Sequence, residues 1–568
     1  MKHRGQIGLY SGYLADSLIW GFSPGSEELG HWLLLHLAEQ AQRGHLRTDL
    51  NRLRQEMTEW LSSLEDLEGI SDRLPEQVTS NLEHLISLGE KNRLIVRLAE
   101  PDSPVSLLEK PRPPLVLSSD GRYLYFLRRR KGEDSLLEKL EARSKRMSVA
   151  ENLYAQGSQG AVMAADSKMD VAAILLDKIT NGLRLILLSG GPGTGKTTAI
   201  VNLLDLLSRS ELKVIMAAPT GRAAARITES LKGKIRADKN LFGRTIQSLL
   251  EMTPNREPRR NANNPLVADL VIVDEVSMVD VALMNQLLDA LPMNAALILA
   301  GDPNQLPSVE SGALLSDLLS GAKEAENANR RGPLWEAVLS LEKVYRSDTG
   351  ILDASAAVRA GDAKALRTAF EVDESLTWHE MVNPSEMAQI IASKYKKHPD
   401  FSELSVLIPL RRGYWSVSVL NDKISKIIGG KTTPFEGMPV MIIRNDASRN
   451  LWNGDRGRIV FRGSKCWASI GFEGREFPLA ALPGWEPAWV QTIHKSQGSE
   501  FDEVVVILPQ GTEHFLTRET LYTAITRAKK RVSMFAEFTE VESILAREVT
   551  RNSRIRDWAA AAYSGGAL

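Results

Sequence analysis

The sequence predicts an α/β fold in which two lobes are each built on a parallel β-sheet. Three observations carry this prediction. From about residue 160, short apolar runs alternate with helical patterns, and a second region of this kind runs from about 346 to the end. A glycine-rich loop, Gly190–Thr197, lies between an apolar run and a helical pattern. Short apolar strands that alternate with helices indicate a parallel sheet covered on both faces.

The elements expected in each lobe follow one another at short intervals. In the first lobe we expect strands at Leu185–Leu188, Val214–Ala218, Leu270–Val273 and Leu297–Ala300, and a helix at Thr198–Leu207. In the second lobe we expect strands near Ser405–Ile408 and Glu503–Leu508. Between these two, short strands are expected at Val440–Ile443, Arg458–Phe461 and Trp467–Ile470, with turns at Asn453-Gly454 and Gly463-Ser464. This change of pattern predicts a small SH3-like β-barrel inserted in the second lobe at about 433–488.

The first 150 residues read differently and show no catalytic constellation. Ser26–Gln42 is expected to be a helix capped by Ser26, with Gly44 just beyond its end. Arg122–Leu127 has the composition of a strand, and Ser135–Met147 reads as a charged helix. We therefore expect a mainly helical N-terminal domain at 1–150 that docks a partner. The first lobe is expected at 151–345 and the second at 346–568.

Composition sets limits on function. The chain has 568 residues, 43% of them hydrophobic and 25% charged, with a formal net charge of -1. The charge balance disfavours a passive nucleic-acid coat but allows a local basic track. A single cysteine, Cys466, excludes a disulfide framework and favours the reducing cytoplasm. No stretch approaches 18 apolar residues, so we expect neither a signal peptide nor a membrane span.

The strongest motif is a phosphate-binding loop. Its residues are Gly190, Gly191, Pro192, Gly193, Thr194, Gly195, Lys196 and Thr197, followed by Thr198. Glycines let the backbone curl so that its N–H groups face phosphate, and the following helix adds its positive end. Lys196 is expected to reach the terminal phosphates of a nucleoside triphosphate, and Thr197 is expected to offer an oxygen to Mg²⁺.

Further residues of the right types follow in order. Asp274 and Glu275 end an apolar strand, so Asp274 suits the magnesium shell and Glu275 can activate water. Gln305 follows the next strand and is a candidate sensor of the γ-phosphate. Arg346 and Arg527 lie in or beside the second lobe. A guanidinium that reaches the γ-phosphate across a cleft makes hydrolysis depend on lobe closure.

Seven motifs in one order resemble the superfamily 1 helicases, and most closely the RecD family, the alpha subunit of exodeoxyribonuclease V. They span about 190 to 530, roughly 60% of the chain. The motifs are Gly190–Thr198, Ala218–Ala224, Asp274–Met278, Gly301–Pro307, Tyr345-Arg346, Val490–Phe501 and Leu521–Lys529. The resemblance implies two RecA-like lobes with ATP and Mg²⁺ between them. It also implies ATP-dependent 5′-to-3′ translocation on single-stranded DNA with unwinding of duplex ends.

The resemblance also assigns residues and partners. Glu500 would touch the nucleotide ribose. DNA contacts would fall on Pro219, Thr220, Gly221, Thr245, Thr492 and His494. The chain is expected to be the motor subunit of a RecBCD-type helicase–nuclease in double-strand break repair, with RecB-like and RecC-like subunits in a heterotrimer. A stand-alone RecD-like helicase is the alternative, and a non-motor scaffolding subunit is a further one.

Two positions depart from the family pattern, and the DNA track has further candidates. Met169 stands where relatives have a glutamine that reads adenine, and Gln247 stands where they commonly have histidine. Arg222 and Arg226 could add charge to the track. Three tryptophans are candidates for stacking on bases, although a core role is favoured for each alone: Trp415, Trp452 and Trp489.

Overall fold

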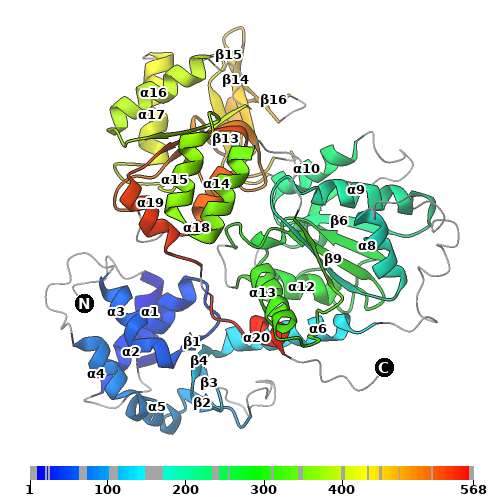
Figure 1. Ribbon diagram of the computed structural model, residues 1–568, viewed down its shortest axis with the longest axis vertical. Coiled ribbons are helices and arrows are strands. Elements are labelled where there is room, and N and C mark those ends of the chain that lie inside the picture. Colours follow the sequence, from blue (N-terminus) through cyan, green and yellow to red (C-terminus); the bar gives the residue numbers. More distant parts are fainter. Residues whose placement is uncertain are drawn as a thin grey trace.

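The computed structural model describes most of the chain. The described residues are 9–19, 22, 26–62, 73–100, 113–146, 171–232, 242–253, 256–308, 312–342, 349–397, 403–430, 434–446, 449, 451–471, 474–512, 516–549 and 551–561. Three bodies are visible in Figure 1: an N-terminal region at the lower left, a first lobe at the right and a second lobe with its insertion at the top. Arg346 and Met169 lie outside the described residues.

The first lobe is built on a parallel sheet in the order β10-β5-β9-β8-β6-β7. Its strands are β5 (Leu185–Gly190), β6 (Val214–Ala218), β7 (Gly243–Thr245), β8 (Leu270–Val273), β9 (Ala296–Gly301) and β10 (Val338–Leu341). Its helices are α8 (Val171–Thr180), α9 (Lys196–Leu206), α10 (Gly221–Leu231), α11 (Ile246–Leu249), α12 (Val281–Ala290) and α13 (Leu314–Asn327). The four predicted strands and the predicted helix are therefore confirmed to within two residues.

Both faces of this sheet are buried, as a parallel sheet requires. Side chains alternate along β5: Leu185 and Leu187 join the core under α12 and α13, whereas Ile186 and Leu188 join the core under α8, α9 and α10. The carboxyl ends of β5, β8 and β9 consequently lie at one edge of the sheet. The loops that follow these strands carry the candidate catalytic groups.

The second lobe repeats the plan with a parallel sheet in the order β11-β20-β19-β12-β18. Its strands are β11 (Leu376–His379), β12 (Leu404–Ile408), β18 (Val490–Thr492), β19 (Phe501–Ile507) and β20 (Ala528–Phe535). Its helices are α14 (Thr349–Ala360), α15 (Ala363–Val372), α16 (Pro384–Lys397), α17 (Val417–Gly429), α18 (Arg518–Ile525) and α19 (Phe538–Leu545). α16 and α17 pack on one face of the sheet, and α14, α15, α18 and α19 pack on the other.

An antiparallel sheet is inserted between β12 and β18. Its order is β16-β15-β14-β13-β17, formed by β13 (Pro439–Ile442), β14 (Arg456–Arg462), β15 (Lys465–Ile470), β16 (Arg475–Pro478) and β17 (Trp485–Pro487). Both predicted turns contain a glycine at positive φ, Gly454 at 96° and Gly463 at 63°. The three predicted strands are present. An SH3-like barrel stays a prediction, because β16 and β17 end the strand order within the described residues.

The N-terminal region combines helices with a small sheet. Its elements are α1 (Leu9–Leu18), α2 (Glu27–Gln42), α3 (Leu53–Ser62), α4 (Leu74–Ser80), α5 (Leu82–Lys91), β1 (Thr48–Asp49), β2 (Ile95–Arg97), β3 (Leu115–Leu117) and β4 (Tyr123–Phe126). The sheet order is β1-β4-β3-β2. α2 begins one residue after Ser26, but the expected cap is wrong in detail, because the Ser26 side chain makes no capping hydrogen bond.

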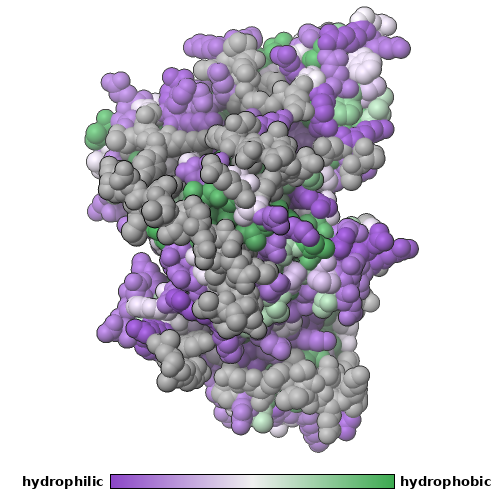
Figure 2. Space-filling model, turned by 90° about the vertical axis from the view of Figure 1, so that its right-hand side faces the viewer, coloured by the Kyte–Doolittle hydropathy of each residue, from purple (hydrophilic) through white to green (hydrophobic). Residues whose placement is uncertain are grey.

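Two segments attach this region to the first lobe. α6 (Leu127–Ser144) packs on α12, and the buried Arg143 donates to the carbonyl oxygens of Leu291 at 2.6 Å and Ala295 at 3.1 Å. α20 (Arg554–Ala560) returns from the second lobe and packs on α13 (Figure 1). No helix among the described residues is long and apolar enough to cross a membrane. Figure 2 shows one face, on which most of the coloured residues are hydrophilic.

Candidate nucleotide and nucleic-acid sites

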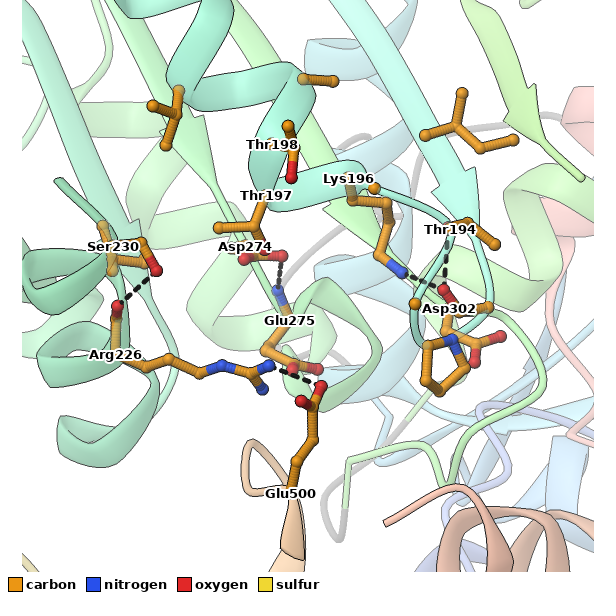
Figure 3. Close-up of a pocket in the computed structure, with 18 of the residues that line it drawn as sticks. Thr194, Lys196, Thr197, Thr198, Arg226, Ser230, Asp274, Glu275, Asp302 and Glu500 are labelled. Carbon is orange, nitrogen blue, oxygen red and sulfur yellow. Dashed lines mark hydrogen bonds and ion pairs between the residues drawn. The ribbon is translucent and has the colours of Figure 1, made fainter. Parts of the chain in front are cut away.

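The phosphate-binding loop, which joins β5 to α9, lines a cavity of about 520 Å³. Gly193 and Gly195 have φ values of 76° and 88°, a backbone conformation that side chains disfavour, so the tight curl requires glycine at both positions. The Lys196 ammonium donates to the carbonyl oxygens of Gly190 and of Gly191, the latter at 2.9 Å (Figure 3). The loop therefore holds the lysine beside the space that phosphates would fill.

Asp274 and Glu275 enter the same cavity from the end of β8. The Asp274 carboxylate accepts a hydrogen bond from the Glu275 backbone N–H at 2.8 Å. Glu275 has a φ of 57°, a left-handed conformation that costs a non-glycine residue about 1 kcal/mol or more. Burial raises the pKa of the Glu275 carboxyl, and the neighbouring Asp274 carboxylate raises it further. The strained turn thus directs a carboxyl of raised proton affinity into the cavity.

Asp302 organises the loop after β9. It is 1% exposed, and its carboxylate accepts from the Asn304 backbone N–H at 3.0 Å and from the Gln305 side-chain amide at 3.3 Å. The hydroxyl of Tyr522, on α18 of the second lobe, donates at 3.0 Å to the Asp302 oxygen that also accepts from the Gln305 amide. The buried Gln305 Oε1 has no hydrogen-bond partner among the described residues. Gln305 lines the cavity, and this oxygen is buried beside it without a partner.

The second lobe holds this loop through further hydrogen bonds. The Thr523 hydroxyl accepts from the Leu306 backbone N–H at 2.9 Å, and the Gln497 side-chain amide donates to the Leu306 carbonyl at 2.9 Å. Both contacts join residues that are about 200 positions apart in the sequence. A change in the relative position of the lobes must therefore move or release the loop that carries Gln305.

Arg527 and Glu500 reach the cavity from the second lobe. Arg527 is buried, and its guanidinium donates to the carbonyl oxygens of Thr523 at 3.1 Å and Ser499 at 3.2 Å. Burial lowers the pKa of Arg527, while the carboxylates of Glu275 and Glu500 oppose this shift. The guanidinium keeps its charge, because arginine does not deprotonate at physiological pH.

An ion pair spans the two lobes at the mouth of the cavity. The Arg226 guanidinium of α10 lies 2.5 Å from the Glu500 carboxylate, as Figure 3 shows. The sequence suggested Arg226 for the nucleic-acid track, whereas the structure places it at the nucleotide cavity. Sequence reasoning also missed Asp302 and Tyr522 as parts of the site. Both lie within the quoted motifs, but only the folded chain shows that they meet.

Three threonines expected at DNA begin the helical turns after strands. Thr220 caps α10 and accepts from Ala223 N–H at 3.2 Å, and Thr245 caps α11 and accepts from Ser248 N–H at 3.0 Å. Thr492 ends β18 and accepts from Lys495 N–H at 3.3 Å. In each case the hydroxyl oxygen is engaged as an acceptor. The O–H remains able to donate to a phosphate oxygen.

The other expected DNA contacts lie beside these threonines. Pro219 precedes Thr220 and is half-buried, and His494 is exposed after β18. A Cβ added to Gly221 would lie 2.3 Å from Cγ of Trp452, so Trp452 of the insertion packs on the start of α10. Gln247 is exposed on α11. These residues come from both lobes and lie at the same strand ends as the threonines.

Trp489 belongs to the core. It is buried, its ring stacks on Phe435 at 6.2 Å, and its indole N–H donates to the Ser425 hydroxyl at 2.9 Å. Trp415 is partly buried against the same core. The buried Trp489 ring is not free to stack on a base, and the contacts of both tryptophans support the core role favoured from the sequence.

Comparisons with known proteins show which family the chain resembles. A family model described as an AAA domain matches residues 176–311, and one described as a UvrD-like helicase C-terminal domain matches residues 487–535. The chain is 34% identical over 411 residues to the RecBCD enzyme subunit RecD of Mycolicibacterium smegmatis, covering 67% of this chain and 73% of that protein.

Two further proteins resemble the chain, one by sequence and one by structure. The ATP-dependent RecD2 DNA helicase of Deinococcus radiodurans is 30% identical over 473 residues, covering 80% of this chain and 59% of that protein. A Bacteroides Pif1 helicase solved with ADP-AlF3 and single-stranded DNA covers 68% of this chain and 95% of its own, at 17% identity and a TM-score of 0.42, too weak a likeness to inform function. The chain therefore belongs to the RecD family of ATP-dependent DNA helicases.

Proposed function

We propose that the chain moves 5′-to-3′ along single-stranded DNA and unwinds duplex ends, with ATP hydrolysed between its two lobes. One observation carries the proposal. Arg527 and Glu500 of the second lobe line the same cavity as Lys196 and Glu275 of the first. A cavity with walls from both lobes allows ATP to draw them together, and hydrolysis to release them.

The proposed chemistry assigns one task to each group. Lys196 binds the terminal phosphates in place of the loop carbonyls that it now contacts. Glu275 accepts a proton from the attacking water, which its raised proton affinity favours. Arg527 stabilises the charge on the transferring phosphoryl group. Gln305 accepts a hydrogen bond from the attacking water through its unpartnered oxygen and reports that contact through Asp302 to Tyr522.

The residues present fit a magnesium ion. Thr197 and Asp274 both line the cavity and supply the hard oxygens that Mg²⁺ prefers. Among the described residues no cluster of three His, Cys, Asp or Glu side chains could hold a metal by itself. That agrees with a site completed by phosphate oxygens and water. The ion would neutralise phosphate charge when bound. Arg346 belongs to the proposed set as a second γ-phosphate contact, from the family resemblance alone.

The proposed DNA path runs over Pro219, Thr220 and Gly221, then Thr245, Thr492 and His494. The three hydroxyls that can donate to phosphate support it. Contacts from both lobes would be made and broken alternately as the lobes close and open. The polarity of movement rests on the family alone.

We further propose that the chain is the motor subunit of a RecBCD-type complex with RecB-like and RecC-like partners. The relative named RecBCD enzyme subunit RecD supports this reading. The RecD2 relative supports a stand-alone helicase as the second candidate. In either case the region before α6 is the proposed docking domain, because it has its own buried core.

Unwinding assays test the proposal. The purified chain, alone and with candidate partner subunits, is given duplexes that carry a 5′ or a 3′ overhang. We expect ATP-dependent unwinding with the 5′ overhang, and co-purification of the partners if the chain is a subunit. Preference for the 3′ overhang overturns the polarity. DNA-stimulated hydrolysis that survives Lys196→Gln refutes the assignment of the site.

A further inference from the structure

We propose that the loop after β12, Arg411–Trp415, is a stacking site for a base of single-stranded DNA, with Tyr414 as the stacking residue. The proposal rests on the proposed function, since it places one more contact on the strand that the motor follows. It concerns a segment between Ile408 and α17, at the top of Figure 1.

The position of the loop follows from strand register. β12 pairs in parallel with β18, and Ile408 lies opposite Thr492. Parallel neighbours end at the same edge of a sheet, so the segment after Ile408 lies beside the segment after Thr492. That second segment contains Thr492 and His494, two of the proposed DNA contacts. The loop therefore adjoins the proposed path of the strand.

The loop presents an aromatic ring to solvent on a fixed support. Tyr414 is 73% exposed, whereas the next residue, Trp415, is partly buried against the core of the lobe. The two rings meet edge to face, with centroids 6.4 Å apart and an interplanar angle of 84°. The Val417 backbone N–H donates to the Leu410 carbonyl at 3.0 Å and closes the loop. Tyr414 is thus held outward while its neighbour anchors the chain.

The loop that carries the exposed ring also carries positive charge. Arg411 is 62% exposed and Arg412 is also exposed, so both guanidiniums can reach a strand beside Tyr414. The nearby Glu486 carboxylate lies 2.7 Å from the Lys495 ammonium and only 3.9 Å from the Arg411 guanidinium. One carboxylate thus faces two cations, Lys495 and Arg411, and Arg412 adds a third positive charge to the same loop. An exposed aromatic ring among cations is the arrangement by which proteins stack bases and hold phosphates without reading sequence.

The charge argues for a nucleic acid rather than a protein partner. Specific protein interfaces place aromatic residues in apolar, charge-depleted centres. Here the exposed aromatic residue follows two exposed arginines in the same loop, next to a strand end already proposed to contact DNA. Every base has a face on which Tyr414 could stack, so we expect tolerance of sequence and a requirement for unpaired bases.

The test measures the affinity of the full-length chain for a fluorescent oligodeoxythymidine over a range of salt concentrations. Tyr414→Ala is expected to weaken binding about fivefold or more, and Tyr414→Phe to retain most of it. Loss of a stacked ring should leave the slope of log K against log salt unchanged, whereas Arg412→Ala should reduce that slope by about one phosphate contact. Trp335→Ala, which removes a 51%-exposed ring beside Arg331 in the first lobe, is the matched control.

The outcomes separate this inference from the proposed function. If the wild-type chain binds the oligonucleotide and hydrolyses ATP with it, but Tyr414→Ala binds equally well, the stacking site is wrong and the motor stands. Equal losses for Tyr414→Ala and Tyr414→Phe also overturn it, because a ring would then not be what matters. A wild-type chain that does not bind single-stranded DNA refutes both.

Discussion

Removal of one hydroxyl, in Tyr522→Phe, should uncouple the second lobe from the nucleotide site. Tyr522 donates to the Asp302 carboxylate at 3.0 Å, and that oxygen otherwise accepts only from the Gln305 amide at 3.3 Å among the hydrogen bonds described. A hydrogen bond to a buried carboxylate contributes about 1.5–3 kcal/mol, which corresponds to roughly 10- to 100-fold in rate. The Tyr522 hydroxyl also lies beside the phosphate loop, 3.1 Å from a Cβ placed on Gly191.

The expected loss is in kcat. The contact joins the lobes and does not hold ATP, so DNA-stimulated ATP hydrolysis should show a kcat lowered about tenfold or more, with KM for ATP nearly unchanged. Tyr395→Phe is the matched control: its buried hydroxyl donates to the Trp489 carbonyl at 2.6 Å within the second lobe. We expect that control to lower thermal stability and to leave kcat within about twofold. A Tyr522→Phe enzyme with the wild-type kcat would refute the coupling.

Three more predictions follow from single residues. Burial and the Asp274 carboxylate raise the pKa of Glu275, and a general base must be ionised. As the pH is lowered, kcat should therefore begin to fall at a higher pH than it would with a glutamate of ordinary pKa. Glu275→Gln should abolish hydrolysis while nucleotide binding persists. Burial raises the pKa of Asp317 from 3.8 to about 7, so the folded state loses stability as the pH rises between these two values and the loss is complete above them. Asp317→Asn should therefore raise the melting temperature at pH 8 but less at pH 5, and an equal gain at both would contradict this. In Gly221→Ala the new Cβ would lie 2.3 Å from Cγ of Trp452, so the tryptophan should be displaced. Unwinding should then fall more than DNA-independent hydrolysis does. Unchanged unwinding would exclude a role for the contact between Trp452 and the start of α10.

The strands and the phosphate loop were predictable because local pattern determines them. Leu270–Val273 is an apolar run that the fold buries on both faces, and its predicted ends match β8. The loop at Gly190–Thr197 needs glycine at two positive φ values, so its sequence is nearly unique. α6 was harder: it begins at Leu127, whereas the sequence predicted a helix only from Ser135. Within the basic stretch after Leu127, the buried Arg130 guanidinium lies 2.9 Å from the Asp134 carboxylate one helical turn later, a pairing that favours the helix.

Contacts between lobes were not predictable from local pattern. Arg226 and Glu500 are 274 positions apart, and nothing in the helix around Arg226 indicates a partner. The same holds for the C-terminal segment, where the Asn552 carbonyl accepts from Leu46 N–H at 3.1 Å and Arg551 donates to the Gly312 carbonyl at 2.7 Å. Such pairs depend on tertiary packing, which periodicity does not encode. The exposed Tyr414 likewise gave no signal in the sequence.

The central claim is that ATP hydrolysis in the inter-lobe cavity drives DNA unwinding. The most direct measurement follows strand separation of a 5′-tailed duplex by the purified chain, with its partners where they are required, beside the Lys196→Gln variant. We predict ATP-dependent unwinding by the wild type and none by the variant, which lacks the ammonium that the loop holds beside the cavity. Equal unwinding by both, or unwinding without ATP, would contradict the claim.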